Sequence, residues 1–210
     1  MPPGSRSHFE AIPQHLRALE ERDACIKVRN LRKEFSTPDG VKVAVDLDEL
    51  DMYEGQIFAL LGHNGAGKTT TLSMLTGLLP MTSGKASIYG MDVEEDMSEI
   101  RKHMGVCPQH DVLWDDLTVR EHLSFFAALK GVPRSDINDE VFAKIREVGL
   151  TEKIDARSAD LSGGQKRKLS VAIALIGGSK VVFLDEPTSG MDPFSRRSCW
   201  ATLQNNREGR

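Results

Sequence analysis

The segment Gly62-His-Asn-Gly-Ala-Gly67-Lys68-Thr69 decides how the rest of this sequence is interpreted. It fits the pattern of two glycines separated by four residues and followed by Lys and Ser or Thr. In such a loop the glycines let backbone N–H groups surround phosphate oxygens. Lys68 is then expected to contact the β- and γ-phosphates, and the Thr69 hydroxyl to bind Mg²⁺. The segment therefore predicts a loop that binds the phosphates of a nucleotide.

The residues on either side of this loop supply the context that the motif requires. A short apolar run from Gln56 to Leu61 precedes it and predicts a buried strand. After the loop, residues 68–79 place Leu72, Leu75 and Leu79 on one helical face before a proline stops the helix. The expected order is strand, glycine-rich turn and helix.

A second apolar run, Val181 to Leu184, ends in the acidic pair Asp185-Glu186. This pattern is typical of a fully buried parallel strand with its acids at the carboxyl end. Asp185 would hold the water shell of Mg²⁺, and Glu186 would polarise a water for attack on the γ-phosphate. Alone, the two acids could simply cap the next segment, but beside a phosphate loop we expect the two roles.

The segment Ser162-Gly163-Gly164-Gln165 begins a predicted helix that continues through Leu169, Val171 and Ile173. Its free N–H groups and the positive end of the helix dipole would form a second anion site. Ser162 and Gln165 also have the spacing of a capping box, so the segment could serve only to start its helix. Both interpretations stay open at this point.

Composition and charge exclude several classes of protein. Hydrophobic residues make up 40% of the 210 residues and charged residues 28%, which fits a globular chain with its own core. With a net charge of −4, the chain has no overall positive charge that would attract duplex nucleic acid. The scattered Cys25, Cys107 and Cys199 fit no disulfide framework and suggest a reducing compartment. The basic run Lys166-Arg167-Lys168 is interpreted as a solvated helix face.

Other segments outline the remaining secondary structure. Residues 1–24 are expected to form a linker or tail with one short helix. The alternating residues Val41 to Asp48 predict a half-exposed strand. Thr118 and Glu121 have capping-box spacing at the start of one apolar helical segment, and residues 141–148 mark a second amphipathic helix.

Taken in order, the phosphate loop, Gln109, Leu161–Gln165, Asp185-Glu186 and Ser189–Asp192 resemble the nucleotide-binding domain of ABC transporters. The resemblance covers about residues 25–210.

Three further segments, Val106–Val112, Leu117–His122 and Gly177–Val182, resemble the A subfamily, which is associated with lipid and sterol movement. The leader Phe9–Val28 is similar to the linker before the first of two such domains.

The resemblance implies an α/β fold of the P-loop NTPase (RecA-like) class. It has a mostly parallel sheet, an antiparallel β edge and an inserted α-helical subdomain. On this basis residues 1–24 form a linker, residues 25–110 and 170–210 the ATP-binding core, and residues 111–169 the helical signature subdomain. No His follows His122 in this sequence, so the chain is expected to be truncated before the family's switch histidine. At least one sheet strand would then be missing beside residues 181–184, and the isolated fragment would be a weak ATPase.

The resemblance also assigns roles to single residues. Phe35 falls where an aromatic ring stacks on adenine; the alternative is a core residue at a strand end. Gln109 would sense Mg²⁺ and the attacking water. Asp192 would be the acid at the dimer seam, although Ser-Gly-Met-Asp departs from the Ala-Leu-Asp of many relatives. The expected catalytic residues are Glu186, Gln109 and Lys68; the expected nucleotide contacts are Phe35, Gly62, Asn64, Gly65, Gly67, Lys68, Thr69, Thr70, Ser162, Gly163, Gly164, Gln165 and Asp192; the expected magnesium ligands are Thr69, Gln109 and Asp185.

The implied function is ATP binding and hydrolysis with Mg²⁺. The domain would close onto a second nucleotide-binding domain in a head-to-tail pair, and this closure would power transport. In this subfamily the transported molecules are lipids. The implied partners are that second domain, the transmembrane domains of the same polypeptide at the cytosolic face of a membrane, and the lipid indirectly, with no nucleic acid. Two alternatives remain: a soluble ABC ATPase without a transport role, and a module that binds nucleotide without turnover because the switch histidine is absent.

Overall fold

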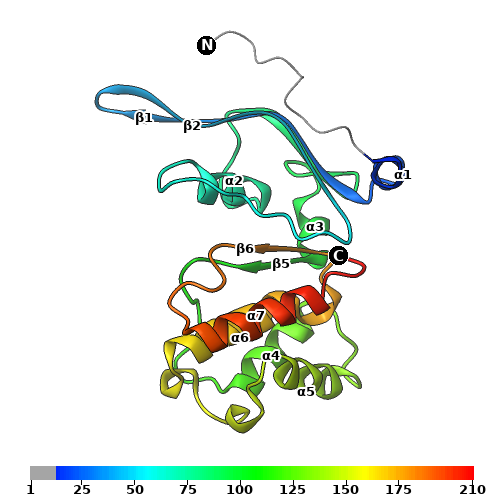
Figure 1. The fold of residues 1–210 in the computed structure, drawn as a ribbon, viewed down its shortest axis with the longest axis vertical. Helices are drawn as coiled ribbons and strands as arrows, with labels where there is room; N and C mark the ends of the chain where they lie inside the picture. Colours follow the sequence, from blue (N-terminus) through cyan, green and yellow to red (C-terminus); the bar gives the residue numbers. More distant parts are fainter. Residues whose placement is uncertain (1–12) are drawn as a thin grey trace.

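The structure, a computed structural model, describes residues 13–210, so Pro2, Pro3 and Phe9 of the predicted leader lie outside the described residues. Figure 1 shows an antiparallel sheet on one side, a pair of parallel strands in the middle and helices on the other side. The elements in chain order are α1 (Gln14–Glu21), β1 (Cys25–Thr37), β2 (Gly40–Tyr53), α2 (Lys68–Leu75), β3 (Ser83–Ile88), β4 (Met91–Asp92), α3 (Met97–His103), β5 (Met104–Cys107), α4 (Val119–Leu129), α5 (Ile137–Glu147), η2 (Thr151–Lys153), η3 (Ser158–Asp160), α6 (Gly163–Leu175), η4 (Ile176–Gly178), β6 (Val181–Leu184) and α7 (Pro193–Asn205).

The antiparallel sheet has four strands in the order β2-β1-β3-β4. β1 and β2 pair along most of their length, from Cys25 opposite Tyr53 to Thr37 opposite Gly40. The predicted strand at residues 41–48 is therefore confirmed as part of β2. Apolar side chains on one face of the sheet pack against α2, α3, β5 and β6.

β5 and β6 pair in parallel, with Met104 opposite Val181 and Cys107 opposite Leu184. This confirms the predicted strand at residues 181–184 and its parallel character. Because both strands end at the same edge, the segments that begin at Pro108 and Asp185 emerge side by side. The two loops that carry predicted site residues are thus neighbours by topology.

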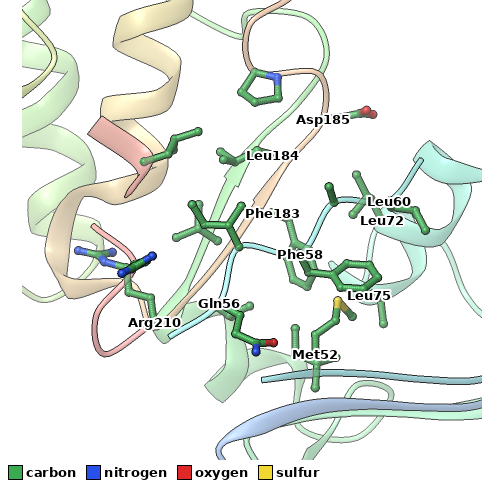
Figure 2. Close-up of a pocket in the computed structure, with 18 of the residues that line it drawn as sticks. Met52, Gln56, Phe58, Leu60, Leu72, Leu75, Phe183, Leu184, Asp185 and Arg210 are labelled. Carbon is green, nitrogen blue, oxygen red and sulfur yellow. The ribbon is translucent and has the colours of Figure 1, made fainter. Parts of the chain in front are cut away.

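The prediction of a strand at Gln56–Leu61 is wrong. No strand among the described residues pairs with this segment, and Ile57, Phe58 and Leu61 are 44%, 47% and 89% exposed. A cavity of about 440 Å³, lined mainly by apolar side chains, separates the segment from β6. Figure 2 shows Phe58 on one side of the cavity and Phe183 on the other. An extended segment becomes a strand only when a neighbour accepts and donates its backbone hydrogen bonds, and here the neighbouring position is open.

The α/β fold class is confirmed, but the expectation of a mostly parallel sheet is wrong: the parallel strands β5 and β6 form a separate two-stranded sheet, and the four-stranded sheet is antiparallel. The segment 56–61, which would extend the parallel sheet, does not pair with β6. The helix after the phosphate loop is also shorter than predicted and ends at Leu75 instead of residue 79. The Thr76 hydroxyl bonds to the carbonyl of Leu72, and Gly77 follows with φ +67°, which stops the helix.

α6 joins two hydrophobic clusters. Its residues Leu169 and Ala172 pack with α4 and α5 in one cluster. On another face, Val171 and Ala174 pack with β5, β6 and α7. The predicted domain boundary at residue 170 falls inside this continuous helix, so the division into core and helical subdomain remains an interpretation of the sequence.

The capping box predicted at Thr118 is confirmed, because the Thr118 hydroxyl accepts from the N–H of Glu121 and the Glu121 carboxylate accepts from the N–H of Thr118. This box starts α4, and both α4 and α5 match the predicted apolar helical segments. Between residues 13 and 210 there is no helix with the length and apolar character needed to cross a membrane.

Candidate nucleotide-binding site

The phosphate loop runs into the N-terminus of α2. Gly67 caps this helix with φ +89°, and a Cβ there would lie 2.4 Å from the carbonyl oxygen of Ala44. Gly65 also has a left-handed backbone, with φ +84°. Both positions therefore need glycine, and the loop delivers free backbone N–H groups to the positive end of a helix, which is a suitable site for an anion.

The Lys68 side chain lies across its own loop. Its ammonium donates to the carbonyl oxygens of Gly62 at 2.7 Å and His63 at 3.0 Å. The His63 ring makes a local contact with the carbonyl of Asn64, which agrees with a loop role for this histidine. The lysine charge is held at the mouth of the loop, where phosphate oxygens could replace the carbonyl groups. Thr70 follows Thr69 in the first turn of α2 and is half-buried.

The structure brings together the two strongest magnesium candidates. The Thr69 hydroxyl donates to a carboxylate oxygen of Asp185 at 2.9 Å, although 116 positions separate them in the chain. A hydroxyl and a carboxylate are ligands that Mg²⁺ accepts, and the ion is commonly held by one or two such groups together with substrate phosphates. This donor pair therefore fits the ion.

Glu186 follows directly, is exposed and has φ +48°, a backbone conformation that non-glycine residues rarely adopt. Strained backbone of this kind persists only where the surroundings enforce it, and it is concentrated at functional sites. Gln109 leaves β5 at the same edge of the parallel pair and is also exposed. Its side chain makes no hydrogen bond within the described residues.

The segment Ser162–Gln165 forms a capping box at the start of α6. The Ser162 hydroxyl accepts from the N–H of Gln165, and the Gln165 side chain accepts from the N–H of Ser162. A Cβ at Gly163 or Gly164 would meet no atom within 4 Å, so nothing inside the described chain requires glycine there. Among residues 13–210 no hydrogen bond joins this segment to the phosphate loop.

Phe35 lies near the end of β1 opposite Lys42 and is 39% exposed. The Lys33 ammonium lies 5.3 Å from the centre of its ring. Asp192 caps α7 by accepting from the N–H groups of Phe194 and Ser195 at 2.9 and 3.0 Å. Hydrogen bonds from Ser195 and the helix N–H groups lower the pKa of Asp192. Its predicted role at a dimer seam stays a prediction.

The interpretation of Lys166-Arg167-Lys168 as a solvated face is wrong at its central residue. Arg167 is only 3% exposed, and it bonds to the loops that leave both β5 and β6. A signal was present in the sequence, because positions 167, 171 and 174 share one helical face and two of them are apolar. This periodicity, and not the run of basic residues, determines which face of α6 is buried.

A glycine loop at the start of α2, with paired acids at the end of a neighbouring parallel strand, defines a nucleotide-binding domain of the P-loop class. The sequence profile of the family described as ABC transporter matches residues 45–189. The chain belongs to the ABC transporter family.

Curated relatives carry A-subfamily names. The chain is 54% identical over 203 residues to the Phospholipid-transporting ATPase ABCA3 of Homo sapiens, which covers 97% of this chain and 12% of that protein. It is 55% identical over 185 residues to the ABC transporter A family member 2 of Dictyostelium discoideum, covering 88% of this chain and 11% of that protein. The chain thus spans about an eighth of the length of these relatives.

Solved structures share the fold. An ATP-binding subunit of an ABC transporter matches with a TM-score of 0.75 at 24% identity, over 87% of this chain and 74% of that chain. A dimeric ATP-binding cassette, described as a post-hydrolysis state bound to ADP and Pi, matches with a TM-score of 0.79 at 20% identity. That match covers 87% of this chain and 85% of the other.

Proposed function

We propose that this chain is the nucleotide-binding domain of an A-subfamily ABC transporter that hydrolyses ATP to drive lipid movement. The observation that carries the proposal is the contact between Thr69 and Asp185. It joins the phosphate loop to the acid at the end of β6, so the loop and the acids form one site. The name of the human relative, a phospholipid-transporting ATPase, supports the reaction and the class of cargo.

The residues present fit Mg·ATP. The phosphates would lie in the loop 62–67, with Lys68 moving from the loop carbonyls to the β- and γ-oxygens. Thr69 and Asp185 would hold Mg²⁺, with Gln109 as a third candidate at the same edge. When bound, the ion would supply positive charge that neutralises the negative charge developing as the terminal phosphate leaves. The exposed ring of Phe35 is available to stack on a base.

Glu186 is the proposed general base. Its carboxylate follows Asp185 directly, so it lies at the edge of the ion site and is exposed to water. An exposed carboxylate beside a phosphate site can orient a water and accept its proton. Gln109, on the neighbouring loop, would help to position the same water.

The segment Ser162–Gln165 is proposed to complete the site of a second nucleotide-binding domain. Its glycines face open space, and it is not bonded to the chain's own phosphate loop. A head-to-tail pair would place this helix start against the γ-phosphate of the partner domain, with Asp192 near the seam. ATP would then hold the two domains together, and its hydrolysis would release them.

The proposed setting is the cytosolic face of a membrane, with the transmembrane domains in the same polypeptide. The chain covers about 12% of the human relative, which leaves most of such a protein to other segments. Opening and closing of the paired domains would shift those segments between two states. A lipid would be moved by these segments and would not contact the chain described here.

The test uses the complete polypeptide in lipid vesicles. Glu186→Gln is expected to lower ATP turnover by about 10²-fold or more while a fluorescent nucleotide still binds, because only the proton acceptor is lost. Lys68→Ala is expected to weaken nucleotide binding itself. Glu152→Gln, at an exposed position in η2, is the matched control and should leave both unchanged.

Equal turnover in the Glu186→Gln and parent proteins would reject the assignment of the base. A parent protein that binds ATP but shows no turnover would favour the module that only binds nucleotide. Turnover without lipid movement between leaflets would favour an ATPase without a transport role.

A further inference from the structure

Arg167 is a buried charge that the proposed chemistry leaves without a role. Its side chain is 3% exposed, and it lies on α6 two positions after Gln165. Burial of a charge is unfavourable unless it is paired and fully hydrogen-bonded. The partners of this guanidinium therefore indicate what it does.

One set of partners follows β6. The Nε of Arg167 donates to the carbonyl oxygen of Pro187 at 3.2 Å, and one terminal nitrogen donates to those of Asp185 and Glu186, the latter at 2.9 Å. Three successive carbonyl groups thus face one cation. They belong to the proposed magnesium ligand, the proposed base and the residue after them.

The other set of partners follows β5. The second terminal nitrogen donates to the carbonyl oxygens of Pro108 at 2.5 Å and Gln109 at 3.3 Å. The same nitrogen lies 3.3 Å from a carboxylate oxygen of Asp111, which also accepts from the Ser170 hydroxyl at 2.8 Å. Asp111 therefore contacts two side chains of α6, those of Arg167 and Ser170, and its carboxylate is the ionic partner of Arg167.

These contacts bear on the strained backbone of Glu186. Its carbonyl oxygen accepts from the N–H of Ser189 at 3.0 Å and from Arg167 at 2.9 Å. With φ +48°, this residue keeps its conformation only if the neighbouring groups over-determine it. The direction of the Glu186 carboxylate is set by that backbone, so a group that fixes the turn also aims the side chain.

We propose that Arg167 is a positioning residue for ATP hydrolysis: it fixes the backbones of Gln109 and Glu186 in one frame with the start of α6. The proposal rests on the function assigned to Glu186 above. Arg167 bonds to backbone carbonyls, so it acts through these residues. Arginine suits the task because five donors on a rigid planar group reach several acceptors at once, whereas lysine offers a single point charge.

The same contacts connect two sites of a dimer. The segment Ser162–Gln165 begins the helix on which Arg167 lies, and it is the part proposed to meet the partner's phosphate. A movement of α6 would therefore displace the chain's own Gln109 and Glu186 through Arg167. Contact of Ser162–Gln165 with the partner's phosphate would in this way change the positions of Gln109 and Glu186 in the chain's own site.

The first test measures turnover and binding in the complete polypeptide. Because a hydrogen bond to a charged group corresponds to roughly one order of magnitude in rate, Arg167→Lys should lower kcat by about tenfold and Arg167→Met by about 100-fold. Nucleotide affinity should stay within about twofold in both, since neither changes the phosphate loop. Arg146→Gln, at an exposed arginine of α5, is the matched control and should change neither quantity.

The pH profile separates positioning from general damage. A buried lysine titrates at a lowered pKa, whereas arginine stays charged. Relative to the parent protein, Arg167→Lys should therefore lose activity as the pH rises. In a Glu186→Gln background, Arg167→Met should lower the residual turnover by at most about tenfold, because one of the two residues through which it acts has lost its carboxylate and only Gln109 remains to be positioned. A further loss of about 100-fold there would overturn the proposal.

A second test does not depend on turnover. Hydrogen exchange in the nucleotide-free protein should be faster in Arg167→Met than in the parent at the amides of Asp185 and Ser189, which bond to the carbonyls of Cys107 and Glu186. Exchange in α4 and α5 should be unchanged. If Arg167→Met does not fold, Asp111→Asn should give the same pattern at smaller amplitude.

The outcomes separate this proposal from the proposed function. Parent-like exchange and turnover in the Arg167 variants would overturn the role of Arg167 and leave the ATPase assignment standing. Absence of ATP turnover in the parent protein would refute the ATPase assignment. Turnover that Glu186→Gln leaves unchanged would refute the assignment of the base, and with it a positioning role of Arg167 through Glu186, whatever the exchange shows.

Discussion

Gly65 and Gly67 both adopt a left-handed backbone, but the space around them differs. A Cβ at Gly65 would meet nothing within 4 Å, whereas one at Gly67 would lie 2.4 Å from the Ala44 carbonyl oxygen. Gly65→Ala should therefore lower the free energy of unfolding by about 1–2 kcal/mol, the cost of the left-handed conformation. Gly67→Ala should lose roughly a further 1–3 kcal/mol because of the overlap. Urea unfolding of the two variants checks the difference, and equal losses would contradict it.

The burial of the three cysteine thiols predicts that they react slowly with alkylating reagents in the folded chain. Cys25, Cys107 and Cys199 are free and buried, and burial raises the pKa of Cys107 to about 12. Because the thiolate is the reactive form, alkylation of Cys107 at pH 8 should be slower by about 10²-fold or more in the folded than in the unfolded chain. Iodoacetamide labelling followed by mass spectrometry measures both rates, and similar rates would show that the thiol is accessible and ionised.

The raised pKa of Cys107 also makes the stability of the fold depend on pH. The folded-state pKa of Cys107 lies above the unfolded value of about 8.5, so the folded state holds the proton more tightly. Its contribution to stability is complete below that value and is lost as the pH rises toward 12. The Cys107→Ala variant should therefore show a weaker fall in stability in this alkaline range than the parent chain.

The site residues that sequence could predict are those with fixed spacing. Gly67, Lys68 and Thr69 are candidates for phosphate binding on sequence alone, because that chemistry demands these residue types at adjacent positions. Arg167 is not, because its acceptors are backbone carbonyls, which leave no trace in side-chain identity. The contact between Thr69 and Asp185 joins positions 116 residues apart, so no local stretch of sequence predicts it.

Two capping boxes allow a matched comparison of helix starts. Thr118 begins α4 and Ser162 begins α6, each with the reciprocal bonds of a capping box. Either residue changed to Ala should cost about 1 kcal/mol of stability, because one helix N–H loses its acceptor. In the complete polypeptide, Thr118→Ala should keep its ATP turnover, whereas Ser162→Ala should lose turnover as well. Unfolding curves and turnover of both variants check this, and parallel behaviour would mean that Ser162 acts only as a cap.

A predicted strand is confirmed where the structure contains a second strand that pairs with it. The run Val181–Leu184 has a parallel partner in β5 and forms a strand. The run Gln56–Leu61 is as apolar, yet it forms none, because no strand among residues 13–210 pairs with it. Apolar character indicates that a segment prefers burial, but hydrogen-bonding partners decide whether it becomes a strand. A sequence window of a few residues contains no information about such distant partners.

The molecule is organised around its parallel strand pair. β5 and β6 separate the antiparallel sheet, α2 and α3 from the helices α4 to α7 (Figure 1). The two sides also meet at Arg210, whose guanidinium donates to the Ser179 carbonyl at 2.6 Å and whose own carbonyl accepts from Gly55. The apolar cavity lies between these same parts, with β6 on one side and residues 56–61 on the other. The cavity is thus lined in part by Asp185 and Glu186, the acids that follow β6.

This arrangement predicts how the isolated 210-residue chain behaves. β6 has no strand partner on the cavity side within residues 13–210, and the facing segment exposes Ile57 and Phe58. An unpaired edge beside exposed apolar side chains promotes association between copies. Phe58→Lys should therefore lower self-association, measured by light scattering against concentration, because a charge at the cavity opposes contact. Leu78→Lys removes an equally apolar side chain, 72% exposed and outside the cavity lining, and should leave association unchanged. Equal effects of the two variants would show that association depends on general surface hydrophobicity and not on this open edge.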